Sequence, residues 1–131
     1  MNDTSVGTEK VVEVIEDEAS YQHMLSEKLG KDGFAVLSAK NGEEGLALAL
    51  DRHPDLILLD LQMPKMSGID FLTALRQDPW GKEAKVIVLT VVDDTEKIAD
   101  VLGQNTFDYY LKADIKIEDL VASIKEKLGT T

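Results

Sequence analysis

Residues 56–68 read LILLDLQMPKMSG, and this stretch decides the fold. Leu56–Leu61 is a short apolar run with little polar alternation, which is typical of a strand covered on both faces of a parallel sheet. The one acidic residue in the run, Asp60, stands near its end. The stretch therefore predicts a buried parallel strand with a carboxylate at its carboxyl end.

Similar apolar runs recur on both sides of this stretch, and helical patterns separate them. The further runs cover residues 11–15, 34–37, 85–89 and 107–111, and the helical patterns cover 20–29, 41–50, 68–76, 93–102 and 114–128. Strands that alternate with helices through right-handed crossovers form an α/β three-layer sandwich. The sequence therefore predicts a five-stranded parallel sheet with helices on both faces.

Size and composition exclude several classes of protein. The chain has 131 residues, the size of one domain, and its 14 basic and 25 acidic residues give a formal net charge of −11. A negatively charged surface repels the nucleic-acid backbone and anionic membranes, so we expect neither as a partner. With no cysteine, disulfides and thiolate metal sites are excluded.

The ends of the chain and its hydropathy lead to further expectations. No apolar run approaches the ~18 residues of a membrane span, and the N-terminus lacks the pattern of a secretory signal, so we expect a cytoplasmic protein. We expect residues 1–9 to be a disordered leader and residues 10–129 to form the domain.

Reactive side chains follow four of the predicted strands. Glu16 and Asp17 follow the first strand, Asp60 ends the third, Thr90 follows the fourth and Lys112 the fifth. Because function in open α/β sheets lies outside the carboxyl ends of the strands, we expect these side chains to converge on one rim. Carboxylates with a backbone carbonyl suit Mg²⁺, and an aspartate beside that ion can attack a phosphoryl group. An ammonium and a hydroxyl can then meet the phosphoryl oxygens.

Four separated motifs carry a resemblance to a known family. They are VIEDE at 14–18, LILLDLQMPKMSG at 56–68, VIVLT at 86–90 and DYYLK at 108–112. Over about residues 10–128 the chain resembles the receiver (phosphoacceptor) domain of bacterial two-component response regulators, in particular the single-domain chemotaxis type. The resemblance implies a flavodoxin-like (βα)5 fold with strand order 2-1-3-4-5.

The resemblance also implies a metal site and a phosphoacceptor. Asp60 resembles the aspartate that is phosphorylated in the family. Glu16 and Asp17 resemble the acidic pair that holds Mg²⁺, together with Asp60 itself and the backbone carbonyl of Gln62.

Three further residues resemble the family's switching groups. Thr90 resembles the hydroxyl residue that moves onto the phosphoryl group, and Lys112 resembles the partner of a phosphoryl oxygen. Tyr109 resembles the aromatic switch residue that turns inward when Thr90 moves. Successive side chains of a strand point to opposite faces of the sheet, so only one of Tyr109 and Tyr110 can be the switch residue.

The implied function is that of a phosphoprotein in phosphorelay signal transduction, a signalling module rather than an enzyme. A histidine kinase or phosphotransfer protein would supply the phosphoryl group, and the domain would assist its own phosphorylation and dephosphorylation. The surface formed by residues 93–102, 107–111 and 114–128 would then bind an unidentified downstream protein. We expect a stand-alone regulator, because no DNA-binding segment follows Leu128, and either a monomer or a phosphorylation-dependent dimer.

The chain departs from the family pattern at four places. Ala113 stands where the family has a proline joined by a cis bond to the lysine, which leaves the state of the Lys112–Ala113 bond open. Val91 replaces a small residue, so phosphoryl entry or loss is expected to be slower. Residues 105–106 read Asn-Thr instead of Gly-Ala. Glu13 lies inside the first strand, where an unpaired carboxylate is costly, so we expect a partner, a shifted strand or partial exposure.

Two alternatives stay open. A degenerate receiver would bind partners without phosphorylation, which Ala113 and Val91 would permit. A haloacid-dehalogenase-like phosphatase also uses a strand-end aspartate, Mg²⁺, a threonine and a lysine. Such enzymes typically carry a second aspartate two residues after the nucleophile, where this chain has Gln62.

Overall fold

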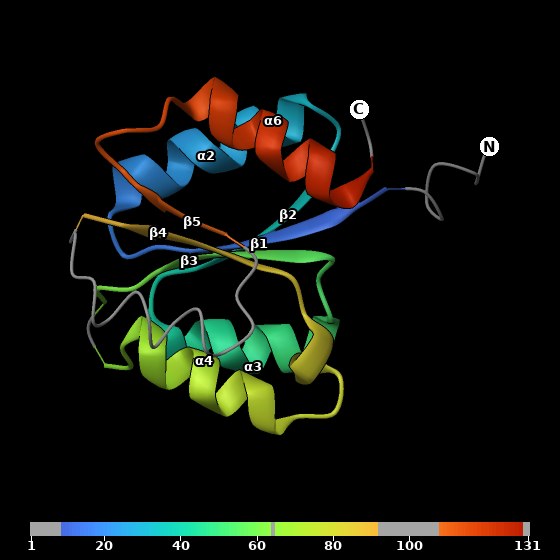
Figure 1. The fold of residues 1–131 in the computed structure, drawn as a ribbon, viewed down its shortest axis with the longest axis vertical. Coiled ribbons are helices and arrows are strands. Elements are labelled where there is room, and N and C mark those ends of the chain that lie inside the picture. Colours follow the sequence, from blue (N-terminus) through green and yellow to red (C-terminus); the bar gives the residue numbers. More distant parts are fainter. Residues whose placement is uncertain (1–8, 64, 92–107, 130–131) are drawn as a thin grey trace.

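The computed structural model of the chain describes residues 9–63, 65–91 and 108–129, which form a parallel sheet between layers of helices (Figure 1). The strands lie in the order β2-β1-β3-β4-β5, which confirms the predicted sheet and its flavodoxin-like order. Their bounds are β1 (Val11–Ile15), β2 (Ala35–Ala39), β3 (Leu56–Asp60), β4 (Val86–Thr90) and β5 (Asp108–Leu111).

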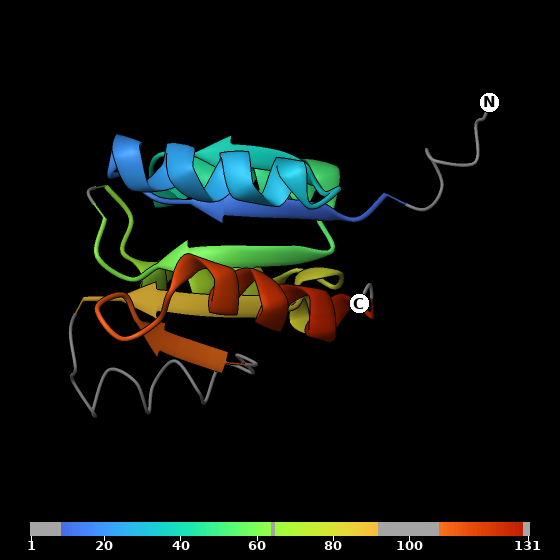
Figure 2. The same cartoon turned by 90° about the horizontal axis from the view of Figure 1, so that it is seen from above.

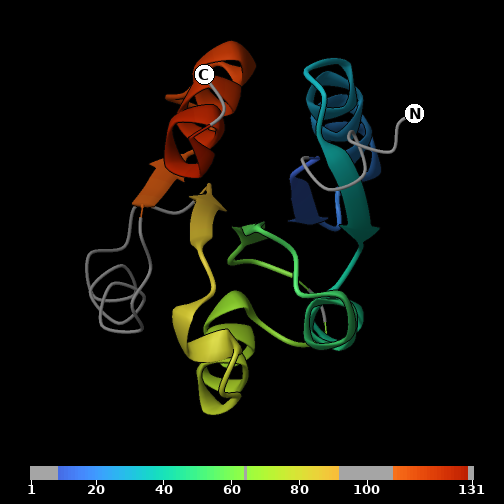
Figure 3. The ribbon, with the colours of Figure 1, turned by 90° about the vertical axis from the view of Figure 1, so that its right-hand side faces the viewer.

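Helices cover both faces of the sheet (Figure 1, Figure 3). α2 (Ala19–Lys31) and α6 (Ile117–Leu128) lie on one face. α3 (Gly42–Arg52) and α4 (Gly68–Gln77) lie on the other, and the short 3-10 turn η1 (Gly81–Glu83) follows α4. In the described part of the chain, no helix combines the length and the apolar character needed to cross a membrane.

Several element boundaries differ from the prediction by one to three residues, and two of these differences have a local physical reason. β2 continues to Ala39 through the exposed Ser38, because an edge strand tolerates a polar residue at its surface. α6 begins at Ile117 and not at Asp114, because Lys116 has an extended backbone with φ −80° and ψ 150°. The helix predicted over 93–102 and the Asn-Thr turn at 105–106 lie outside the described residues.

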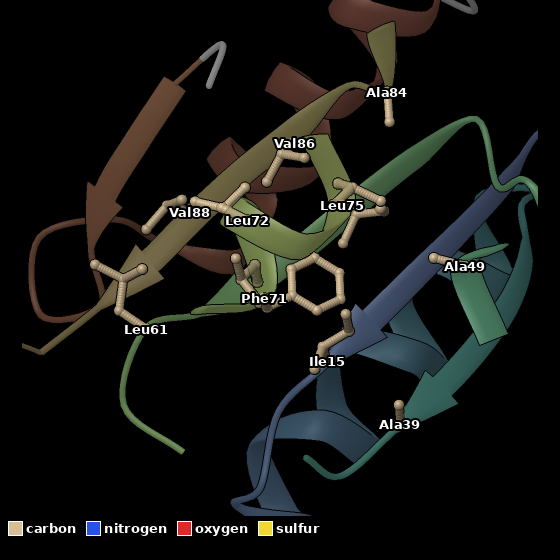
Figure 4. Close-up of a cluster of buried hydrophobic side chains, with 12 residues drawn as sticks. Ile15, Ala39, Ala49, Leu61, Phe71, Leu72, Leu75, Ala84, Val86 and Val88 are labelled. Atoms are coloured by element: carbon tan, nitrogen blue, oxygen red, sulfur yellow. The ribbon is translucent and has the colours of Figure 1, made fainter. Parts of the chain in front are cut away.

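Alternate strand residues enter two apolar cores. β3 and β4 are buried along their whole length, which explains their unbroken apolar sequences. Under the face covered by α3 and α4, the fully buried Phe71 lies beside Ile15 and Leu75 (Figure 4). This packing fixes the end of β1, and with it the residues that follow Ile15.

Gly81, which opens η1, provides a stability test of this packing. A Cβ atom at Gly81 would collide with the backbone carbonyl oxygen of Leu75 in α4. We therefore expect Gly81→Ala to destabilise the domain by about 1–3 kcal/mol, measured by urea unfolding. Gly30→Ala is the matched control, because a Cβ there meets no atom within 4 Å and should stabilise α2 by about 0.5–1 kcal/mol. Equal effects of the two substitutions would contradict the packing described here.

Candidate functional site

The carboxyl ends of the strands meet at one edge of the sheet, which we call the rim (Figure 2). Its residues follow from the register of the strands. Ile15 is opposite Leu59, so Glu16 comes to lie next to Asp60 at the ends of β1 and β3. Thr90 is the last residue of β4 and lies opposite Leu111 of β5. Lys112, the residue after Leu111, therefore lies beside the end of β4. The rim thus holds the reactive residues expected from the sequence.

Three carboxylates gather at the rim. Glu16, Asp17 and Asp60 each offer one oxygen, and these oxygens all lie within 4.8 Å of one another. Glu16 and Asp60 are buried, with exposed fractions of 2% and 5%, whereas Asp17 is exposed. We call these three residues the acidic cluster. Two buried carboxylates at this spacing repel each other strongly unless a cation compensates them.

Lys112 is the cation that the chain itself supplies. Its Nζ lies 2.6 Å from Glu16 Oε1 and 3.6 Å from Asp60 Oδ2. At 2.6 Å the contact with Glu16 is a close, charge-assisted ion pair between two largely buried groups. The backbone N–H of Lys112 donates to the carbonyl oxygen of Thr90 at 2.9 Å, which ties the loop after β5 to the end of β4.

The electrostatics of the rim raise the pKa of Asp60. Burial is the largest cause, the charges of Glu16 and Asp17 add to it, and the N–H of Gln62 together with Lys112 opposes it; the resulting pKa is about 6. Burial by itself would lower the pKa of Lys112, but its contact with Glu16 and the charge of Asp60 outweigh burial and raise it. Lys112 therefore stays protonated at neutral pH.

The backbone orients Asp60 and the neighbouring groups. The N–H of Gln62 donates to Asp60 Oδ1 at 3.1 Å, which leaves Oδ2 facing Lys112. Thr90 is fully buried at the end of β4, one strand away from Asp60. The roles of Thr90 and of the Gln62 carbonyl stay predictions.

Three residues that the sequence singled out near the rim lie as follows. The Lys112–Ala113 bond is trans, which answers the question left open by the sequence. Val91 is 65% exposed. Tyr109 is 38% exposed and so lies at the surface in this structure, whereas its neighbour Tyr110 packs against the core and its hydroxyl lies 2.9 Å from Ser123 Oγ.

The expectation for Glu13 was wrong. β1 has the predicted bounds, Glu13 is fully buried, and neither of its carboxyl oxygens has a hydrogen-bond partner. Burial, with a further contribution from the negative charge of Glu44, raises the pKa of Glu13 to about 8. The side chain is therefore a neutral acid at pH 7, because protonation costs less than burying an unpaired charge.

Two residues of α2 at the rim escaped the sequence analysis. The Gln22 side-chain amide donates to the backbone carbonyls of Glu16, at 3.2 Å, and Ala39, at 2.7 Å, and so joins the ends of β1 and β2. The Tyr21 ring lies under the Lys112 ammonium, 4.7 Å from its centroid. Both lie in the first turns of the helix that directly follows Asp17, and this closeness in sequence is the signal that could have found them.

The acidic cluster fits a hard divalent cation. Three carboxylates against the one ammonium of Lys112 leave an excess of negative charge in a largely buried place. Oxygen ligands of this kind suit Mg²⁺, which keeps waters in its remaining positions. The donor set at the rim therefore matches the ion that the sequence predicted.

Comparison with known proteins places this geometry in a family. Residues 12–125 match the model of the response regulator receiver domain. The phosphate regulon regulatory protein PhoB of Pseudomonas aeruginosa is 32% identical over 122 residues, which cover 93% of this chain and 53% of PhoB. The chain thus spans about half the length of this curated relative.

Solved structures agree with the match in sequence. The chemotaxis protein CheY4 of Vibrio cholerae superposes with a TM-score of 0.83 at 27% identity, covering 91% of this chain and 98% of CheY4. A receiver domain protein of Methanospirillum hungatei gives a TM-score of 0.85 at 27% identity, with 93% and 95% covered. The chain belongs to the response regulator receiver domain family, the phosphoacceptor signalling domains of two-component systems.

Proposed function

We propose that Asp60 accepts a phosphoryl group in a Mg²⁺-dependent reaction, and that a histidine kinase or a phosphotransfer protein supplies it. The observation that carries this proposal is the position of Asp60. Its carboxylate is held by the N–H of Gln62 on one side, faces Lys112 on the other, and lies within the acidic cluster. A fixed carboxylate beside an ammonium and within an acidic cluster suits nucleophilic attack on a phosphoryl group.

In the proposed transfer, a carboxylate oxygen of Asp60 attacks the phosphorus of a phosphohistidine. An O–P bond forms and the P–N bond breaks, its electron pair remains on the imidazole nitrogen, and a proton from solvent neutralises that nitrogen. The product is an acyl phosphate on Asp60. Lys112, 3.6 Å from Asp60 Oδ2, can reach an oxygen of the new group, and the Thr90 hydroxyl can donate to another.

Glu16, Asp17 and Asp60 would hold Mg²⁺, with the backbone carbonyl of Gln62 as a further ligand. When bound, the ion supplies charge neutralisation at the phosphoryl oxygens. The three side chains arrive from two adjacent strand ends, so the pairing of β1 with β3 sets their spacing before any ion binds. Phosphorylation would then shift Thr90 and Tyr109, and the surface of β5 and α6 would bind a downstream protein.

Intact mass spectrometry tests the proposal. The chain is incubated with Mg²⁺ and acetyl phosphate, and we expect the mass of one phosphoryl group to be added and then removed by hydroxylamine, which cleaves acyl phosphates. Asp60→Asn should show no gain. Asp51→Asn, the same substitution at an exposed position of α3, should gain like the wild type.

Other outcomes would overturn the proposal. No gain in mass of the wild type would favour the degenerate receiver. An undiminished gain in Asp60→Asn would show that another residue is the phosphoacceptor. Release of many phosphates per chain from simple phosphate esters would favour the phosphatase.

A further inference from the structure

The side chain of Lys112 needs a restraint that its own backbone does not supply. The residue lies in the turn after β5, and its bond to Ala113 is trans. The hydrogen bond from its N–H to the Thr90 carbonyl fixes the backbone but leaves the four-carbon side chain free to rotate. The side chain is nevertheless only 12% exposed. Contacts made by the ammonium must therefore determine where it points.

Two kinds of group contact the ammonium. Glu16 at 2.6 Å and Asp60 at 3.6 Å attract it by charge, and the face of the Tyr21 ring lies 4.7 Å away. The carboxylates are also the proposed ligands of Mg²⁺, so a bound dication would compete with Lys112 for them. The Tyr21 ring carries no charge and stays available to the ammonium in either state.

Tyr21 is itself held firmly. It lies in the first turn of α2, is partly buried, and packs against the core cluster formed on the α2 and α6 side of the sheet. An aromatic ring has few rotamers, so little entropy is lost when it is fixed in place. The ring can therefore act as a rigid platform for a flexible lysine.

We propose that Tyr21 is a positioning residue whose ring face holds the Lys112 ammonium beside Asp60. The inference rests on the proposed function, because Lys112 must act on a phosphoryl group at Asp60 for its position to affect a rate.

Kinetics of phosphorylation by acetyl phosphate at saturating Mg²⁺ provide the first test. Tyr21→Leu, which removes the ring but keeps an apolar side chain, should slow the reaction by about three- to tenfold. Tyr21→Phe keeps the ring and should stay within about twofold of the wild type. In a Lys112→Met background, Tyr21→Leu should cause no further loss, which a purely structural role of Tyr21 would not explain.

NMR of the unphosphorylated chain provides a second, independent test. The ring should shift the Lys112 ε-methylene protons upfield in the wild type and in Tyr21→Phe but not in Tyr21→Leu. A wild-type rate in Tyr21→Leu, or an equal loss in Tyr21→Phe, would overturn the inference while the proposed function stands. If the wild type takes up no phosphoryl group, the proposed function fails, and the NMR shift alone decides whether the ring holds Lys112.

Discussion

Glu13→Leu is expected to stabilise the domain by about 3 kcal/mol at pH 7, and by more at pH 8. Glu13 is fully buried in β1, and its carboxyl oxygens have no hydrogen-bond partner. Leucine has a similar size and no polar atoms, so it would fill the same space without the cost of burying a carboxyl group. The charge of Glu44 in α3 adds to the effect of burial and raises the pKa of Glu13 further.

The pH dependence follows from the direction of the pKa shift. The pKa of Glu13 is about 8 in the folded chain, against an ordinary value of 4.5. Below pH 4.5 the group is protonated in both states and its ionisation does not affect stability. Between pH 4.5 and 8 the unfolded chain loses the proton first, so stability falls by about 1.4 kcal/mol per pH unit. Above pH 8 the loss is complete.

Urea unfolding of wild type and variant at pH 5, 6, 7 and 8 measures this difference. Subtracting the two curves cancels the contribution of the acidic cluster, which is present in both proteins. Glu13→Gln should lose the same pH dependence, because its amide does not titrate. Glu9→Gln, at an exposed position just before β1, should keep it. A difference between Glu13→Leu and wild type that does not change with pH would contradict the buried neutral acid.

The sequence could predict those parts of the structure that depend on local pattern and topology. Unbroken apolar runs such as Leu56–Leu59 identify buried parallel strands, and parallel strands end at the same edge, which is why Asp60 and Glu16 could be placed together. The protonation state of Glu13 depends on the solvent exclusion of the whole core, which no local pattern encodes. The Tyr21–Lys112 contact joins residues 91 positions apart and depends on how α2 lies against the loop after β5.

The acidic cluster leads to the second large effect, which concerns Mg²⁺. A ligand that binds the folded chain alone stabilises it by about 2.7 kcal/mol at 100 times its dissociation constant. Mg²⁺ at that concentration should therefore raise the free energy of unfolding of the wild type by this amount, measured against NaCl of equal ionic strength. Binding to the folded chain is expected because the cation relieves the repulsion among Glu16, Asp17 and Asp60, which Lys112 offsets only in part.

Asp17→Asn and Glu18→Gln separate specific binding from general screening. Each substitution removes one negative charge from an exposed, adjacent position, but only Asp17 belongs to the acidic cluster. If Asp17→Asn weakens Mg²⁺ binding about tenfold, it should retain only about half of the wild-type gain at the same Mg²⁺ concentration, whereas Glu18→Gln should retain all of it. Equal gains in the free energy of unfolding of all three proteins would indicate screening. No gain in the wild type would show that Mg²⁺ does not bind at the rim. Because both positions are exposed, neither outcome can be attributed to a disturbed core.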